Sequence, residues 1–353
     1  MASTAPPVAR NPKDNMKSTW RTADKSTWGP FHWIFELLSM HPTDIGKPIK
    51  VNQKNDKVPY ISQFDSHKWV LFYALWPMAV QQAYIWATGE NFSPYFAFFF
   101  YSLVYKLNAI GEFRMIRKNG HKYGFLDGDV HERDQIPDHS VHKVFFSLQM
   151  TSLVRPAAAI LLCYKRSEGP LTMSPWILLE IGLYGIILDF YFYWYHRVMH
   201  ETDFLWKYHR THHLTKHPNP LMTLFADSEQ EFFDVIGVPM MTWATMRLIG
   251  LPMGYYEWWI CHQYIVFTEL VGHSGLRVFA HPPSTLGWFL ELFDAQLCIE
   301  DHDLHHRKGW KNSANYGKQT RLWDKLFGTC AERIELTPEN IDYNYQLKLA
   351  IFN

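Results

Sequence analysis

Long apolar stretches separated by short polar segments dominate the first two thirds of the chain. As helices rising 1.5 Å per residue, four of them are long enough to cross a bilayer core of about 30 Å. They occupy residues 69–88, 93–110, 144–164 and 175–195. Two more apolar segments, 232–249 and 255–272, form a pair that either spans the membrane or dips into it and returns. The pattern predicts an all-α integral membrane protein with four or more transmembrane helices.

A basic segment follows the second apolar stretch and sets the expected orientation. It carries Arg114, Arg117, Lys118 and Lys122, which predicts a cytosolic loop by the positive-inside rule. Counting crossings from this loop puts the ends of the fourth stretch and of the last apolar pair on the cytosolic side. Arg155, inside the third stretch, is costly in lipid, so we expect it to snorkel, to pair with a carboxylate or to face a polar interior.

Composition fits a membrane part joined to a sizeable polar part. Hydrophobic residues make up 47% of the chain and aromatic residues 17%, while the mean hydropathy of -0.22 is below that of a bundle made only of spanning helices. The formal net charge is zero and no basic tract stands out, which argues against nucleic acid as a partner. The four cysteines are scattered, so we expect reduced thiols and no disulfide framework.

The same patterns predict four regions. We expect a polar, cytosolic N-terminal segment at 1–66, whose first 25 residues form a flexible lead-in without a signal peptide. Transmembrane helices follow at 67–173, a catalytic region with a cytosolic helical cap at 174–329, and a C-terminal tail at 330–353.

Three histidine clusters lie at the predicted cytosolic face, with the sequences HRVMH (196–200), HRTHH (209–213) and HDLHH (302–306). Residues three or four apart share one face of a helix, so each cluster can grip an ion from consecutive turns. Neutral imidazole suits iron, copper, nickel or zinc. Eight imidazoles exceed what one ion accepts, so the clusters predict a site for two ions with positions left open for oxygen or water. The predicted ligands are His196, His200, His209, His212, His213, His302, His305 and His306, with His273 as a ninth.

Other side chains are weaker candidates for this site. Metal-bound histidines usually donate their second ring N–H to a carboxylate or a carbonyl, and Asp189, seven residues before His196, is a natural partner. Asp227 and Glu231 are further candidates for that supporting role. His217, His262 and His281 are less favoured as ligands, and histidines of the N-terminal half, such as His32 and His121, are expected at the surface.

The order HRVMH, HRTHH, HSG, HDLHH, NYG and WDKLFGT, within residues 177–329, resembles the fatty-acid hydroxylase / sterol desaturase superfamily. The resemblance implies an endoplasmic-reticulum membrane protein whose nine candidate histidines hold two non-haem iron ions facing the cytosol. The HSG element at His273 is similar to the methyl-sterol oxidase and sterol desaturase branch. One departure concerns residues 225–231, where many relatives carry a histidine followed by proline and this chain has none. A carboxylate such as Asp227 or Glu231 takes its place, or the coordination differs.

These observations predict an O2-dependent hydroxylase or desaturase that oxidises an unactivated C–H bond of a lipid-soluble substrate. A sterol, a fatty acyl lipid and a terpenoid or polyketide-derived intermediate all fit, with a slight preference for a polycyclic lipid from the HSG element. The chain has no His-Pro-Gly-Gly haem signature and no GxGxxG motif. The resemblance therefore implies an external donor, a cytochrome-b-type protein with an NAD(P)H-dependent reductase. The alternatives are a non-oxidative isomerase, lyase or hydrolase on the same scaffold and, less favoured, a metal transporter, whose ligands would spread along the spans.

Overall fold

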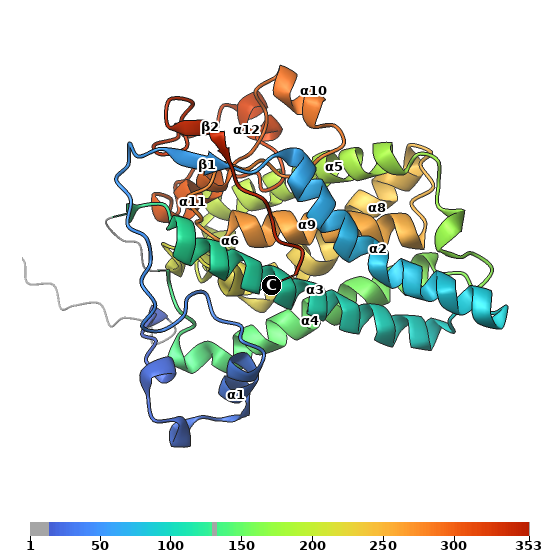
Figure 1. Ribbon diagram of the computed structural model, residues 1–353. Coiled ribbons are helices and arrows are strands. Elements are labelled where there is room, and N and C mark those ends of the chain that lie inside the picture. Colours follow the sequence, from blue (N-terminus) through green and yellow to red (C-terminus); the bar gives the residue numbers. More distant parts are fainter. Residues whose placement is uncertain (1–13, 129–132, 353) are drawn as a thin grey trace, which may run out of the picture.

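The computed structural model describes residues 14–128 and 133–352, and within them the chain is mostly helical. The long helices run side by side and form the body of the molecule (Figure 1). They are α2 (Gln63–Thr88), α3 (Pro94–Tyr123), α4 (Val141–Cys163), α5 (Ile177–Glu201), α8 (Val238–Leu248) and α9 (Tyr255–Gly272). Helix α9 is the central one, since it packs against α2, α3, α4 and α5 and buries nearly all of its side chains. The helical part of the predicted fold is confirmed.

Serine and glycine residues begin and end the first two long helices. Ser62 caps α2 by accepting a hydrogen bond from the backbone N–H of Asp65, and Ser93 caps α3 by accepting one from Phe96. Gly89 ends α2 with a φ of 75°, in the left-handed region that glycine adopts without strain. Local capping chemistry thus fixes where the first helical hairpin turns.

Shorter elements surround the ends of the long helices. The short α-helices are α1 (Pro30–Leu37), α6 (Asp203–His209), α7 (Ser228–Phe232), α10 (Gly287–Leu292), α11 (Ile299–Arg307) and α12 (Leu322–Phe327). Single turns of 3-10 helix are η2 (Trp20–Thr22), η3 (Lys25–Thr27), η5 (Asp138–Ser140), η6 (Pro170–Thr172), η7 (His212–Leu214) and η8 (Pro220–Leu224), and η9 (Phe233–Gly237) is a π-helical turn.

Two strands are the exception to the predicted all-α fold. Strand β1 (Val58–Tyr60) pairs in parallel with β2 (Ile341–Gln346), with Val58 opposite Ile341. Leu347 and Leu349, just after β2, are buried in the core. Residues far apart in the sequence, from the predicted N-terminal segment and the predicted C-terminal tail, therefore lie side by side (Figure 1).

Among the described residues, two helices are long and apolar enough to cross a membrane, fewer than the four or more predicted. They cover Asp138–Cys163 and Ile177–Glu201. The remaining predicted stretches are helices too, but α8 has only 11 residues and α9 is enclosed by its neighbours. The apolar pattern did not distinguish α9 from a membrane span because a helix buried on all sides by protein is as hydrophobic as one that faces lipid.

The basic segment after the second stretch is not a loop. Helix α3 continues through it to Tyr123. Arg117 forms an ion pair with Asp44 at 3.1 Å, and Arg114 donates a hydrogen bond to the Leu38 carbonyl oxygen. These basic side chains hold the N-terminal segment against the helical body, and the prediction of a loop was wrong.

The predicted flexible lead-in is also ordered where the structure describes it. Trp20 is buried, and its indole N–H donates to the Ile136 carbonyl oxygen at 3.2 Å. Asp14 forms an ion pair with Arg210, which lies within the second histidine cluster. Residues 14–25 therefore pack onto the body of the protein, while residues 1–13 lie outside the described part of the chain.

Candidate metal centre

The first histidine cluster lies in the last turns of α5. His196 and His200 are four residues apart, so both rings project from the same face of the helix into the protein. Both side chains are buried, with at most 1% of their surface exposed. Apolar contacts that bury α5 therefore also fix the position of these two imidazoles.

The second cluster divides its histidines between two directions. Helix α6 ends at His209, and the following 3-10 turn begins at His212. His212 and His213 are adjacent, so their rings leave the chain in different directions, with an angle of 89° between the ring planes. One short segment therefore supplies ligand atoms to two neighbouring places.

The third cluster makes the same division. His302, His305 and His306 lie on α11, with all three rings buried. His273, directly after the end of α9, meets His302 with their Nε2 atoms 2.9 Å apart. The central helix thus contributes a ligand candidate from a part of the sequence without any histidine cluster.

The structure brings all nine predicted ligands together in two adjoining groups. Within each group the candidate ligand atoms lie within 4.8 Å of one another. The first group is His196, His200, His209, His213 and His305, and the second is His212, His273, His302 and His306. The two adjacent pairs, 212–213 and 305–306, each give one ring to each group. Ions held by the two groups would therefore be neighbours, linked through the backbone at both pairs.

Backbone carbonyls orient several of these rings. The Nδ1 atoms of His196, His200 and His305 lie 2.7–2.8 Å from the carbonyl oxygens of residues 316, 310 and 314. A carbonyl only accepts, so each Nδ1 carries the proton and each Nε2 keeps a free lone pair. His273 is held in the same way by the carbonyl oxygen of Glu269 at 2.8 Å.

The lone pairs meet where an ion would sit. The Nε2 atoms of His196 and His209 are 3.0 Å apart, although the Nδ1 of each ring already donates elsewhere, to the Tyr316 carbonyl and to the Gln230 side chain. Two neutral rings in this state cannot form a hydrogen bond with each other. Two nitrogens about 2.1 Å from one ion and at right angles to each other are about 3.0 Å apart, which matches this separation. The residues therefore fit a metal cation.

Burial keeps the imidazoles in the form that binds metal. Removal from water lowers the pKa of His209, His212 and His213, and neighbouring histidines add to the shift because two positive rings would repel. The pKa of His273 falls to about 4 for the same main reason. All of these rings are neutral at physiological pH, as coordination of iron, copper, nickel or zinc requires.

The three carboxylates expected to support the histidines have other direct partners. Asp227 pairs with Lys143 at 3.4 Å and accepts from the Thr211 hydroxyl, and Glu231 accepts from the Ser147 hydroxyl. Neither bonds to a histidine of the two groups, within the part of the chain that the structure describes.

Asp189 acts on the site through the backbone. It is fully buried and accepts hydrogen bonds from the backbone N–H groups of Lys318, Gln319 and Thr320 and from the Thr320 hydroxyl. That loop directly follows Tyr316, whose carbonyl orients His196. Asp189 therefore holds the loop that positions a ligand, and does not hold the ring itself.

The WDKLFGT motif holds the same loop from the other side. Asp324 accepts from the backbone N–H groups of Tyr316 and Gly317 and from the Thr329 hydroxyl. A Cβ atom at Gly317 would lie only 2.6 Å from the Thr320 carbonyl oxygen, so a side chain does not fit between the two carboxylates. The NYG and WDKLFGT elements thus hold the Tyr316 carbonyl in the position in which it orients His196.

Sequence reasoning missed Gln230 as the partner of His209. Its Oε1 accepts from His209 Nδ1 at 2.9 Å, and its amide N–H donates to Asp234 at 3.3 Å. Gln230 lies within the 225–231 stretch, in which the resemblance leads one to expect a histidine. The absence of that histidine was the feature of the sequence that could have indicated a different residue in its place. The uncharged Gln230 amide thus orients a histidine ring, a role that the sequence analysis assigned to a carboxylate.

The comparisons with known proteins agree with this site. The family model described as "Fatty acid hydroxylase" matches residues 181–329, which contain all nine histidines. The fatty acid hydroxylase vlmA of Lecanicillium sp is 41% identical over 320 residues, which cover 86% of this chain and 87% of that protein.

The chain belongs to the fatty acid hydroxylase family. The superfamily indicated by the sequence motifs is thereby confirmed.

More distant relatives match the catalytic half. Methylsterol monooxygenase 2-2 of Arabidopsis thaliana is 30% identical over 183 residues, 50% of this chain and 62% of that protein. Human alkylglycerol monooxygenase is 27% identical over 161 residues, 44% of this chain and 31% of that protein. No solved structure matches the chain. The names of these relatives support an oxidoreductase that acts on lipids.

Buried charges line the site of this hydroxylase-family protein. Arg155 forms an ion pair with Glu269 at 3.3 Å, and Glu269 forms a second ion pair with Lys318 at 2.9 Å. Of the three alternatives considered for Arg155, the structure selects the pair with a carboxylate. Asp234, in the π-helical turn, is buried and has one oxygen without a hydrogen-bond partner.

A small cavity borders the histidines, and a larger cavity shares part of its walls. The small cavity has a volume of about 20 Å³, and its walls include rings of both groups and the buried charges around Glu269. A volume of roughly 10–15 Å³ is enough for one water molecule, so one water fits. The larger cavity, of about 110 Å³, is enclosed mainly by apolar side chains of α1, α3, α4 and α9. Thr223, Leu224 and Glu269 belong to the walls of both cavities.

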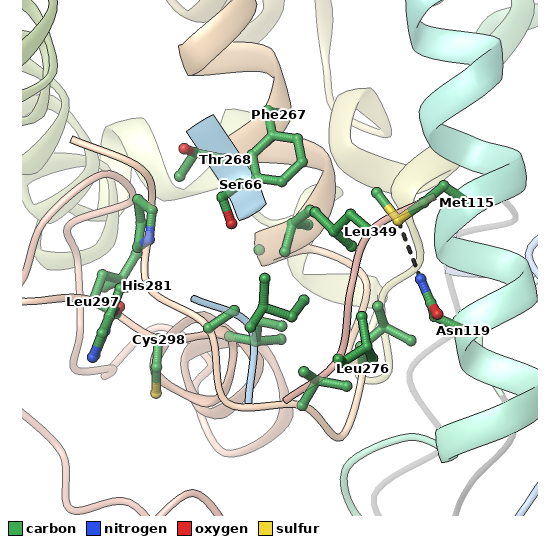
Figure 2. Close-up of a pocket in the computed structure, with 18 residues that line it drawn as sticks. Ser66, Met115, Asn119, Phe267, Thr268, Leu276, His281, Leu297, Cys298 and Leu349 are labelled. Atoms are coloured by element: carbon green, nitrogen blue, oxygen red, sulfur yellow. Dashed lines mark hydrogen bonds between the residues drawn. The ribbon is translucent and has the colours of Figure 1, made fainter. Parts of the chain in front are cut away.

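A third cavity lies away from the metal centre. Figure 2 shows Phe267 and Thr268 of α9 on one side of it and Cys298, Leu276 and Leu349 around the rest. Its walls include none of the nine histidines. The segment after β2 closes this cavity, so it belongs to the packing of the chain ends.

The histidines less favoured as ligands lie outside the two groups. His217 pairs with Asp127 at 3.1 Å, and His281 Nδ1 donates to the Leu297 carbonyl oxygen. His262 is buried beside the Trp258 ring and belongs to neither group. His121 is also buried, where it accepts from the backbone N–H of Asp44, so its prediction as a surface residue was wrong.

Proposed function

We propose that this protein is an O2-dependent membrane hydroxylase with two non-haem iron ions, which oxidises an unactivated C–H bond of a lipid-soluble substrate. The observation that carries the proposal is the pair of buried histidine groups beside an apolar cavity. The names of the relatives, fatty acid hydroxylase and monooxygenase, favour hydroxylation over desaturation.

The five and four histidines of the two groups would hold the ions. Iron bound there would supply activation of O2, with the balance RH + O2 + 2 e⁻ + 2 H⁺ → ROH + H2O. The two electrons come from outside the chain, and we propose a cytochrome-b-type protein with an NAD(P)H-dependent reductase as their source.

The chain's own residues provide the setting for this reaction. Neutral imidazoles bind the cations without adding negative charge, and the carbonyls of residues 310, 314 and 316 keep their rings oriented. The apolar walls of the larger cavity exclude water and accept the hydrocarbon part of the substrate. Glu269, held by Arg155 and Lys318, brings polar groups to the boundary between the two cavities.

We place the protein in the endoplasmic-reticulum membrane with the metal centre toward the cytosol. Helices α4 and α5 are the proposed spans. The histidines at the end of α5 then lie at one membrane face, where a soluble haem domain can deliver electrons. The substrate enters from the bilayer, between the helices that enclose the larger cavity.

The test uses the full chain, purified in detergent and loaded with ferrous iron. With a reducing system and candidate lipids, we expect O2 uptake coupled to incorporation of an atom from isotopically labelled O2 into the lipid, together with two iron ions per chain. His212→Ala should lower the bound iron and abolish the incorporation. His142→Ala, at an exposed position on α4, is the matched control and should behave like the native protein.

A non-oxidative reaction on the same scaffold is the outcome that would overturn the proposal. Such a reaction is worth testing because some relatives, 31% identical over 46% of this chain, are named very-long-chain aldehyde decarbonylase. Conversion of a lipid without O2 uptake, or unchanged turnover in His212→Ala, would exclude the hydroxylase assignment.

A further inference from the structure

A single lysine lines the larger cavity between α3 and α4. Lys106 projects from α3 in the same row as Ala109, Ile110 and Phe113, which also line the cavity and which recur at helical spacing. Its neighbours Leu103 and Leu107 are about half exposed, so the lysine is at the apolar outer surface of the helix pair. A positive charge in such surroundings is costly unless it finds a partner.

The protein itself does not supply this partner within the described residues. Lys106 forms no ion pair or hydrogen bond there, and the one carboxylate that lines the same cavity, Glu269, is already held by Arg155 at 3.3 Å and Lys318 at 2.9 Å. Unlike those two cations, Lys106 is only partly buried, so its ammonium group stays accessible to a molecule that enters the cavity.

The facing helix adds one polar group that is also free to bind. Gln149 of α4 lines the cavity, and its side-chain amide makes no hydrogen bond with any described residue. The nearby hydroxyls of Thr151 and Ser152 donate to backbone carbonyls of their own helix and are therefore occupied. An ammonium group and an amide N–H together form a recognition site for an anion.

The rest of the cavity is suited to a hydrocarbon tail. The lining row on α3 from Lys106 to Phe113 covers about 10 Å of helix. The walls of the cavity also include Thr223 and Leu224, which border the small cavity beside the histidines. A volume of about 110 Å³ is comparable to the ~150 Å³ engineered cavity that holds one benzene, which suits a segment of a flexible chain better than a fused ring system.

We propose that Lys106 and Gln149 bind the anionic head group of a single-chain lipid, whose tail follows the apolar cavity toward the metal centre. The inference rests on the proposed function for the fate of the tail, but not for the binding itself. Because the head group is held at Lys106 and Gln149, the distance from these residues to the small cavity selects the carbon that is oxidised. A sterol, whose polar group is an uncharged hydroxyl, would leave the Lys106 charge without a partner.

The test measures binding to the full-length protein in a zwitterionic detergent, by displacement of the fluorescent fatty acid cis-parinaric acid. The probes are palmitate, palmitoyl lysophosphatidic acid, and the uncharged methyl palmitate. Palmitate or the lysophosphatidic acid should bind at least about tenfold more tightly than the methyl ester, since a hydrogen bond to a charged group contributes more than a neutral one. The tighter of the two anions identifies the head group as a carboxylate or a phosphate.

Variants assign the effect to the lysine. Lys106→Met should weaken binding of the anions about tenfold and leave binding of methyl palmitate unchanged, whereas Lys106→Arg should keep most of the anion affinity. Lys118→Met, at an exposed position on the same helix, is the matched control and should bind like the native protein. Unchanged binding of methyl palmitate also demonstrates that Lys106→Met is folded.

Two results would overturn this inference: equal affinity for acid and ester, or unchanged anion binding in Lys106→Met. Its failure is distinguishable from failure of the proposed function. His212→Ala should lose oxidation of the lipid but bind palmitate normally. Conversely, anion binding that depends on Lys106 without any O2-dependent product would refute only the hydroxylase assignment.

Discussion

Replacing Gln230 by leucine removes the side chain that orients the His209 ring. Gln230 is buried, and its Oε1 accepts from His209 Nδ1 at 2.9 Å. Leucine has a similar volume, so the packing around the site changes little. The substitution leaves the Nδ1–H of His209 buried without an acceptor and allows the ring to turn or to change its tautomer, which removes the lone pair that would face the ion.

The structure sets the size and the selectivity of this effect. Loss of a group that orients a metal-bound histidine typically lowers metal affinity by 10- to 100-fold, or about 1.4–2.8 kcal/mol. His209 belongs to the first histidine group and not to the second. Gln230→Leu should therefore weaken the binding of one of the two ions and leave the binding of the other unchanged.

The assay is titration of the iron-loaded protein with a chelator, followed by measurement of the iron that stays bound. At a chelator concentration that leaves two ions on the native chain, Gln230→Leu should retain about one. Gln230→Glu keeps an acceptor oxygen for the His209 Nδ1–H, in the place of the Gln230 Oε1. That variant should retain both ions.

Asp227→Asn is the matched control, because Asp227 bonds to Lys143 and Thr211 and to no candidate ligand. It should retain both ions as the native chain does. If Gln230→Leu keeps both ions at every chelator concentration that the native protein tolerates, or if Asp227→Asn loses iron as readily, the role assigned to Gln230 is wrong.

Three further predictions concern the buried charges and the histidines. Arg155→Met leaves Glu269 with only Lys318 and should lower stability by about 3 kcal/mol, seen as a lower Tm in detergent; adding E269Q should restore part of the loss. Asp189→Asn replaces an acceptor oxygen by a donor that faces backbone N–H groups, and should cost about 2–3 kcal/mol and reduce bound iron; normal iron content would contradict its role in the loop. In the metal-free protein the pKa of His273 is lowered to about 4, so the unfolded state binds a proton that the folded state does not between about pH 6.5 and 4. Through His273 alone, the stability of the metal-free protein should therefore be complete above pH 6.5 and fall by roughly 3 kcal/mol toward pH 4. The lowered pKa values of His209, His212 and His213 should add to this loss, which unfolding in denaturant at a series of pH values would measure.

The candidate ligand set could be predicted from the sequence because it depends on local spacing. Residues three and four apart share a helix face wherever the helix goes, so HRVMH, HRTHH and HDLHH indicate metal chemistry without knowledge of the fold. His273 was identified from its position at the end of an apolar helix. The helices themselves followed from long apolar stretches bounded by serine, glycine and proline.

Only the tertiary structure decided how the nine rings divide between two groups and which groups orient them. The adjacent pairs 212–213 and 305–306 separate because of the direction in which each backbone enters the site, and this direction depends on packing against α5 and α9. The partners of the rings are mainly backbone carbonyls, and a carbonyl leaves no mark in a sequence, since every residue has one. The roles of Asp189 and Gln230 could not be predicted either, because their hydrogen-bond partners are brought near them only by the tertiary structure. Apolarity along the chain likewise identified the helices, but which of them are enclosed by protein depends on their neighbours in space.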